Sequence, residues 1–303
     1  MKKDKSEYPF LGIALGGGGV RGAAHVGVLQ VLDKEKIKIG SISGVSAGAI
    51  IAAMYAYSLD AIWIEKRFRN ILSSSLFNKV LQKSDIINKP SNSMFTDIKN
   101  SFYKHVIALT NLHKLSIIDN SLLQEILSLL IPINTFEELR IPLKIISTDL
   151  KSGNDIINDR GDLITALIQS CAIPGIFKPI SQGSNLIVDG GISNPIPIMP
   201  IKNECHFTLV VDIGMYQFQE LDDWNVLSIK QRSSIITSNA LKRQLASLAD
   251  FVITPDTAGV KWSNFDDGEM LLNNGKLAGE QNISSLKNMI TKKKNILSAG
   301  ISS

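Results

Sequence analysis

The sequence predicts an α/β fold, a three-layer sandwich in which helices cover a mainly parallel central sheet. Two observations support this prediction. Over the first sixty residues, short apolar runs alternate with helical patterns, which is typical of parallel strands joined by crossover helices. Apolar runs of strand length then return after residue 142. The chain has 303 residues, of which 44% are hydrophobic, so it is long enough to bury a substantial core.

The first four elements alternate in type. FLGIAL (10–15) is a short apolar run that predicts a buried strand, and residues 22–36 carry apolar positions at helical spacing. A second strand is expected at 39–45. It is followed by a helix at 46–57 whose first turns hold almost only small residues.

Residues 60–140 no longer alternate between strand and helix patterns. They predict helices separated by polar stretches. The helical segments are expected at 62–72, 93–109 and 119–130. We expect a helical, cap-like insertion at about 60–120. No stretch has the composition of a linker, so a single domain over residues 1–303 is expected.

The remaining chain returns to alternating strands and helices. Strands are expected at 142–150, 154–159, 185–191, 207–214 and 250–256. Helices are expected at 162–175, where Pro174 stops the pattern, near 226–248, and from about 276 onward.

Composition excludes several classes of function. The net charge is only +4 and the basic residues are dispersed, so no nucleic-acid partner is expected. Cys171 and Cys205 show neither CxxC spacing nor a Cys/His cluster, so neither a zinc site nor a disulfide framework is indicated. No apolar run approaches the roughly 20 residues of a membrane span, and the N-terminal run is too short for a signal peptide. We expect a cytoplasmic protein; transient contact with a membrane surface stays open.

The glycine-rich loop GGGGVRG (16–22) fits two kinds of anion site. Gly17, Gly19 and Gly22 satisfy G-x-G-x-x-G between a strand and a helix, as in dinucleotide-binding folds. That fold also needs an acidic residue about 20 positions later, and the second strand ends without one. No Gly-Lys-Ser/Thr sequence follows the loop either. No nucleotide cofactor is therefore expected.

The second strand ends instead in GVSAG (44–48), which has the G-x-S-x-G pattern of a nucleophile elbow. In such an elbow the strand turns so tightly into the helix that the flanking positions must lack Cβ atoms. Gly44 and Gly48 satisfy this demand, and Ser46 lies at the apex. Ser46 is accordingly the candidate nucleophile.

A serine nucleophile needs a base. Of the four histidines, only His206 would complete the order serine, acid, histidine, and it opens a predicted strand, so we interpret all four as structural. A partly buried carboxylate can serve as the base because burial raises its pKa. Asp189 in NLIVDGG is one candidate. Asp149 and Asp212 also end strands, so spacing alone leaves the choice open.

These motifs together resemble those of the patatin-like phospholipases, a family that uses a Ser–Asp dyad. The blocks GGGGVRG, GVSAG, SCAIPGIFKPI and VDGGISNPIP occur in the family's order, and the resemblance extends over roughly residues 10–285. It implies that Ser46 is the nucleophile and Asp189 the base. It further implies an oxyanion hole formed by the amides of Gly17, Gly18 and Gly19, with Arg21 as a supporting basic residue. No metal or cofactor is implied.

The expected function is that of a serine acyl hydrolase that cleaves lipid carboxylic esters, with phospholipid or lysophospholipid as the implied substrate class. An esterase or transacylase acting on other acyl groups stays open. A non-catalytic lipid-binding or regulatory protein that retains the pocket is the alternative from a different class.

Overall fold

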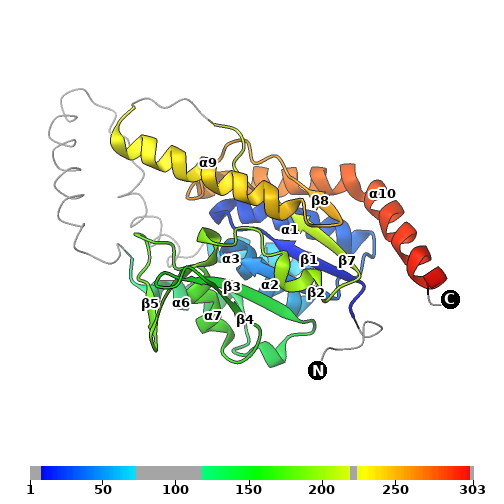
Figure 1. The fold of residues 1–303 in the computed structure, drawn as a ribbon, viewed down its shortest axis with the longest axis horizontal. Helices are drawn as coiled ribbons and strands as arrows, with labels where there is room; N and C mark the ends of the chain where they lie inside the picture. Colours follow the sequence, from blue (N-terminus) through cyan, green and yellow to red (C-terminus); the bar gives the residue numbers. More distant parts are fainter. Residues whose placement is uncertain (1–7, 73–117, 219–223, 301–303) are drawn as a thin grey trace.

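The computed structural model describes residues 8–72, 118–218 and 224–300. A mixed sheet forms its centre (Figure 1). Its strands are β1 (Leu11–Leu15), β2 (Ser41–Val45), β3 (Leu143–Asp149), β4 (Asp155–Asn158), β5 (Ile180–Gln182), β6 (Asn185–Asp189), β7 (Phe207–Val211) and β8 (Phe251–Ile253). The spatial order is β5-β6-β3-β2-β1-β7-β8, and β4 pairs with β3. The neighbours in the spatial run β3-β2-β1-β7-β8 pair in parallel. The pairs that involve β4, β5 and β6 are antiparallel.

Helices flank this sheet. They are α1 (Ala23–Lys34), α2 (Ala47–Ser58), α3 (Ala61–Leu72), α6 (Asn120–Leu130), α7 (Leu163–Ser170), α8 (Met199–Lys202), α9 (Val226–Ala246) and α10 (Gly268–Gly300). A 3₁₀ turn, η2 (Gly19–Gly22), leads into α1. The predicted mainly parallel α/β fold is confirmed.

The secondary structure differs from expectation in a few places. Helix α10 begins eight residues before the expected start at 276. Strand β5 and helix α8 were not predicted, because three or four residues are too few to show a period. The helix expected at 93–109, with most of the expected insertion, lies outside the described residues.

Alternation along the strands divides the buried apolar residues between two faces of the sheet. In β1, Leu11, Ile13 and Leu15 join a large cluster with residues of α1, α2, α3, α6, α7 and α10. Ala14 faces the other way, into a smaller cluster with residues of α8 and the end of α9. Because successive side chains of a strand point to opposite faces, the sheet is the middle of three layers.

Helices α1 and α10 touch backbone to backbone. A Cβ atom added at Gly27 would lie 2.1 Å from the Leu272 carbonyl oxygen, and one at Gly275 would lie 2.1 Å from the Ala24 carbonyl oxygen. Only glycine allows two helices to approach so closely. Helix α10 is thereby fixed against the helix that follows the glycine-rich loop.

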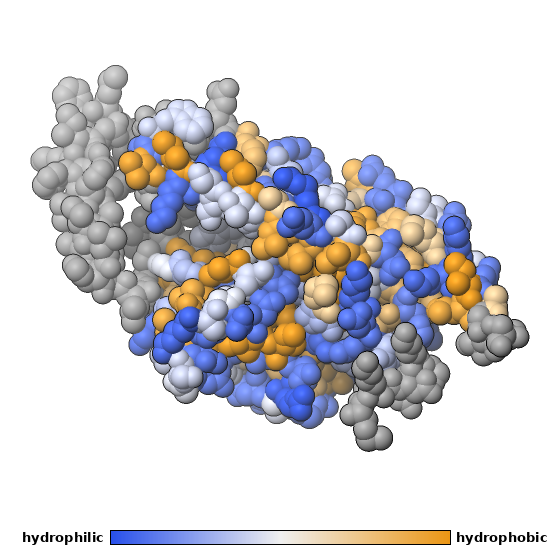
Figure 2. All heavy atoms as spheres, in the orientation of Figure 1, coloured by the Kyte–Doolittle hydropathy of each residue, from blue (hydrophilic) through white to orange (hydrophobic). Residues whose placement is uncertain are grey.

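The outer surface mixes apolar and polar side chains. Exposed apolar residues of α9 include Val226, Ile229 and Ile236. On the face drawn in Figure 2, apolar atoms (orange) are interspersed with hydrophilic atoms (blue). Among the described helices, none combines the length and the apolar content that crossing a bilayer requires.

Candidate active site

Ser46 sits at the turn between β2 and α2 with φ 55° and ψ −128°. A non-glycine residue with positive φ is strained, and such strain persists only where the surroundings impose it. Here the strand and the helix impose it. A Cβ atom at Gly44 would lie 2.5 Å from the Gly48 carbonyl oxygen, and one at Gly48 would lie 2.3 Å from the Leu15 carbonyl oxygen. The G-x-S-x-G spacing thus allows a turn that presents the Ser46 side chain at its apex.

A second serine holds this turn in place. The Ser46 backbone amide donates to the Ser170 hydroxyl oxygen at 2.9 Å, and that hydroxyl donates to the Ile146 carbonyl oxygen at 2.6 Å. All three groups are buried. Ser170 therefore connects the elbow to β3 and α7.

Replacing Ser170 by alanine should destabilise the protein. The change leaves the Ser46 amide without its partner, and an unpaired buried polar group costs about 1–3 kcal/mol. We expect a fall of that size in the free energy of unfolding, measured by chemical denaturation. The exposed Ser234 is the matched control, because its replacement by alanine removes no buried partner. An unchanged unfolding free energy for Ser170→Ala would show that the Ser46 amide does not need this bond.

Asp189 ends β6 and lies beside Ser46, whose side chain interacts with the Asp189 carboxylate and favours its ionised form. The Gly191 amide donates to the same carboxylate at 2.7 Å, so the Gly-Gly turn orients it. Burial raises the pKa of Asp189 from 3.8 to about 6, although the Ser46 side chain, the bond from the Gly191 amide and the nearby Lys242 charge oppose the rise. The result is an oriented carboxylate of raised basicity in contact with the elbow serine.

The other two strand-end aspartates have structural partners. The Asp149 carboxylate accepts bonds from the Leu186 amide and the Ser152 hydroxyl, and these bonds lower its pKa. The Asp212 carboxylate accepts from the Gly214 amide and the Tyr216 hydroxyl. The geometry thus distinguishes three acids that sequence spacing could not.

The described histidines lie in structural settings. His25 on α1 is fully buried, and its Nε2 lies 2.8 Å from the Gly16 carbonyl oxygen. Because a carbonyl oxygen only accepts, Nε2 carries the proton, and burial lowers the pKa of His25 to about 4. The His206 ring packs against those of Tyr8 and Phe10. His105 and His113 lie outside the described residues.

The glycine-rich loop follows β1 and passes beside the elbow. A Cβ atom at Gly17 would lie 3.4 Å from the Ser46 Cβ atom. The Gly17 amide donates to the Pro195 carbonyl oxygen at 3.1 Å and is therefore already bonded. Within the described ranges, the amides of Gly18 and Gly19 have no hydrogen-bond acceptor. Of the three amides implied by the resemblance, these two are free to bind a ligand.

Arg21 lies in the 3₁₀ turn at the end of this loop. Its Nε donates to the Gly18 carbonyl oxygen at 3.0 Å, while its Nη1 atom is buried without a hydrogen-bond partner in the described part of the chain. Burial lowers the pKa of Arg21 to about 10, against the opposing charge of Asp212. The guanidinium therefore stays charged at neutral pH and faces the loop backbone.

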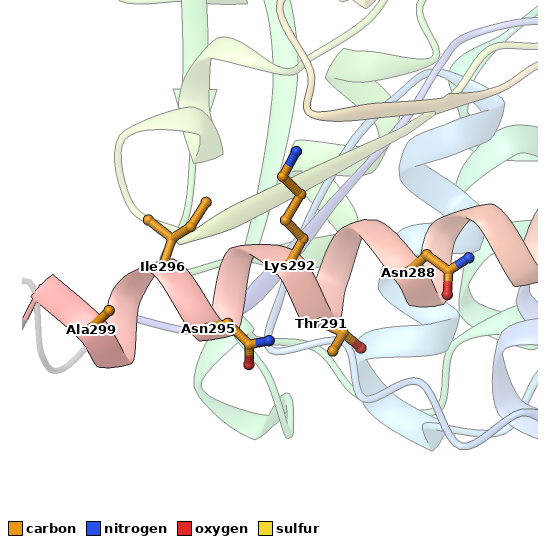
Figure 3. A pocket seen from close by; sticks show the side chains of 6 residues that line it. All are labelled: Asn288, Thr291, Lys292, Asn295, Ile296 and Ala299. Carbon is orange, nitrogen blue, oxygen red and sulfur yellow. The ribbon is translucent and has the colours of Figure 1, made fainter.

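An apolar cavity of about 420 Å³ opens at Ser46. It is bounded by Gly19 and Cys171 and by apolar side chains of α1, α2, α3, α6 and α10, with Glu65 and Arg69 among its few charged residues. A second hollow follows the last turns of α10, where Figure 3 shows six side chains from that one helix. That hollow lies against none of the candidate site residues. Within the described ranges, no three His, Cys, Asp or Glu side chains gather as metal ligands would.

Sequence reasoning missed Lys242, a buried side chain on α9 whose Nζ donates to the Gly17 carbonyl oxygen at 3.1 Å. Its position in the helix was the sequence signal that could have identified it. Lys242 and Asn239 lie at helical spacing with Ala246 on the buried face of α9. A lysine on the buried face of an amphipathic helix is unusual unless its charge is paired.

The fold and this site define an α/β protein with a serine at a strand-to-helix elbow, beside a buried aspartate and an apolar cavity. Residues 13–201, more than half of the chain, match the family described as patatin-like phospholipase. The chain belongs to the patatin-like phospholipase family.

Several known proteins are similar to this chain. An uncharacterized NTE family protein of Mycobacterium tuberculosis is 30% identical over 211 residues, which are 69% of this chain and 50% of that protein. Lysophospholipase NTE1 of Cryptococcus neoformans is 27% identical over 67% of this chain and 11% of its own length. The chain thus spans half or less of these relatives. The crystal structure of VipD from Legionella pneumophila matches this chain with a TM-score of 0.52 at 17% identity. The match covers 92% of this chain and 67% of VipD, and the two proteins share a fold.

Proposed function

We propose that this protein is a serine acyl hydrolase that cleaves carboxylic esters of lipids, with Ser46 as nucleophile and Asp189 as general base. The observation that carries the proposal is that the buried Asp189 carboxylate lies close enough to Ser46 to interact with its side chain. Membership of the patatin-like phospholipase family supports it. A weakly nucleophilic hydroxyl gains reactivity when a neighbouring base accepts its proton.

The proposed reaction proceeds in two steps. Asp189 accepts the Ser46 proton as the Ser46 oxygen attacks the ester carbonyl, and the proton then passes to the departing alcohol. The acyl group is left on Ser46. Water, deprotonated by Asp189, cleaves this acyl-enzyme and releases the fatty acid while the proton returns to Ser46. The raised pKa of Asp189, about 6, brings its basicity closer to neutral pH, where proton transfer is more efficient.

The negative charge that develops on the carbonyl oxygen needs donors. The Gly18 and Gly19 amides support an oxyanion hole because they lie in the loop beside Ser46 and have no acceptor in the described ranges. Helix α2 begins directly after Ser46, so its positive end also faces this position. The bonded Gly17 amide is not part of the hole that we propose.

The apolar cavity supports a lipid acyl group as the substrate portion bound beside Ser46. About 420 Å³ lined mainly by aliphatic and aromatic side chains favours a long hydrocarbon chain over a polar substrate. The similarity to a lysophospholipase agrees with this assignment. We therefore propose phospholipids or lysophospholipids as the substrate class.

A fluorophosphonate probe tests the proposal, because such probes react covalently with activated serines. We expect labelling at Ser46, identified by mass spectrometry, and its complete loss in Ser46→Ala. Ser234→Ala, which removes an exposed serine hydroxyl, should label like the wild type. The same preparations should release fatty acid from lysophosphatidylcholine only when Ser46 is present.

A folded wild-type protein that neither labels nor releases fatty acid from any lipid ester would reject the hydrolase. In that case, tight binding of the uncleaved lipid would support the non-catalytic lipid-binding alternative. Circular dichroism of each variant would confirm that the comparison is made between folded proteins.

A further inference from the structure

Three side chains donate hydrogen bonds to three successive carbonyl oxygens of the glycine-rich loop. His25 Nε2 bonds to the Gly16 oxygen at 2.8 Å, and Arg21 Nε bonds to the Gly18 oxygen at 3.0 Å. Between them, Lys242 Nζ bonds to the Gly17 oxygen at 3.1 Å. All three donors are buried. Every carbonyl from Gly16 to Gly18 is thus held by a side chain.

These bonds also determine where the loop amides point. In a trans peptide the C=O and the following N–H lie in one plane and point in opposite directions. A side chain that holds the Gly17 carbonyl therefore turns the Gly18 amide away from itself, and one that holds the Gly18 carbonyl does the same for the Gly19 amide. These are the two loop amides without an acceptor in the described part of the chain.

Lys242 differs from the other two donors in its origin. His25 and Arg21 lie on α1 and η2, within nine residues of the carbonyls that they hold. Lys242 lies 225 residues away on α9, beyond the segment 13–201 that matches the family. Helix α9 packs on the face of the sheet opposite to α1, and it thus contacts the loop through the Lys242 side chain.

Burying Lys242 here is unfavourable unless something compensates. Lys242 is 5% exposed. Both burial and the neighbouring Arg21 charge disfavour the ammonium, whereas Asp212 and Asp189 favour it. An apolar residue of similar length would avoid this cost. Within the described ranges, the hydrogen bond of the Lys242 ammonium goes to the Gly17 carbonyl oxygen.

We propose that Lys242 is a positioning residue of the oxyanion hole, which holds the Gly17 carbonyl and thereby directs the Gly18 amide toward the carbonyl oxygen of the substrate. This inference rests on the proposed function. It assigns to α9 a part in the reaction in addition to its packing on the sheet.

The experiment compares Lys242→Met, which keeps the length but cannot donate, with Lys242→Arg, which keeps a charged donor. Lys230→Met on the exposed part of α9 is the matched control. Loss of one oxyanion donor costs about 10²–10³ in kcat, so a misdirected donor should cost about 10- to 100-fold. We expect this fall in kcat for Lys242→Met with KM within twofold of the wild type, substantial recovery in Lys242→Arg, and no change in Lys230→Met.

The pH profile gives a readout that a merely structural role would not change. The groups facing Lys242 are Arg21 from the loop, Asp212 after β7, Asp189 at the end of β6 and His25 on α1. Burial lowers the pKa of Lys242 to about 8, and a charged donor forms about twice as strong a bond as a neutral one. Activity of the wild type should therefore decline above about pH 8. Lys242→Arg should shift this decline to higher pH, because arginine stays charged.

A folded Lys242→Met whose kcat stays within threefold of the wild type would overturn the proposal. If that variant fails to fold, an identical alkaline decline in the wild type and Lys242→Arg would overturn it. Hydrogen exchange of the Gly17 and Val20 amides, which bond to Pro195 and Trp262, reports loop order without turnover. We expect faster exchange in Lys242→Met, and unchanged exchange would overturn the proposal even if the wild type cleaved no ester.

Discussion

Asp189→Asn should lose activity and gain stability at the same time. Asparagine cannot accept the Ser46 proton, and a general base contributes about 10²–10⁴ to the rate, so kcat/KM should fall by that factor. The same change removes a buried charge. We expect the free energy of unfolding at pH 8 to rise by up to about 3 kcal/mol, the equivalent of the difference between a pKa of 3.8 and one of about 6.

The direction of this stability change depends on whether the folded or the unfolded state binds the Asp189 proton more tightly. A carboxyl whose folded pKa lies above its unfolded value holds its proton more tightly in the folded state. Stability from that proton is fully present below about pH 4 and is lost as the pH rises through about 6. The wild type should therefore be less stable than Asp189→Asn at pH 8, and the difference should shrink toward pH 4.

Urea denaturation at the two pH values, combined with ester hydrolysis, measures both effects. Asp159→Asn is the control, because Asp159 is exposed and its only partner in the described part of the chain is the exposed Arg160. A variant that retained full activity would reject Asp189 as the base. A variant less stable than the wild type at pH 8 would show that the interactions of Asp189 with Ser46 and Gly191 outweigh the cost of burying the charge.

Gly48→Ala should disrupt the elbow itself. The added Cβ atom would lie 2.3 Å from the Leu15 carbonyl oxygen and 2.7 Å from that of Gly16, both of which are backbone atoms. Helix α2 and β1 would have to separate, and overpacking of this kind costs about 1–3 kcal/mol or more. We expect a loss at the upper end of this range. Labelling of Ser46 by the fluorophosphonate probe should also fall strongly, because the nucleophile moves with the turn.

Gly268→Ala serves as the stability control for this change. Gly268 has a helical φ of −56°, and nothing lies within 4 Å of an added Cβ atom. Its replacement should leave the free energy of unfolding unchanged or raise it by about 0.4–1 kcal/mol. If Gly48→Ala and Gly268→Ala were equally stable, the close approach of α2 to β1 would not constrain position 48.

The sequence predicted most of the strands and long helices because period and turn chemistry are local properties. Ser46 and its two glycines are an example, since the tight turn requires all three within five residues. The choice of Asp189 over Asp149 and Asp212 could not be made locally. It depends on which carboxylate the sheet brings beside Ser46, and this is a matter of pairing between β3 and β6.

The glycine-rich loop shows the same limit. The glycines were visible in the sequence, yet the bonding of the Gly17 amide to Pro195 joins segments almost 180 residues apart. Lys242 was hidden for a similar reason. Its inward position on α9 can be read from the helical period, but its acceptor is the backbone of Gly17, which leaves no pattern in side chains.

The cavity also contains a sulfur atom with consequences for chemoselectivity. Cys171 lies in the wall near Ser46, and burial together with the Asp189 charge raises its pKa well above the ordinary value for a thiol. Burial also raises the pKa of Cys205, to about 11. Because the thiolate is the reactive form, both cysteines stay poor nucleophiles at neutral pH. An electrophile that enters the cavity therefore meets an unreactive thiol beside the serine hydroxyl.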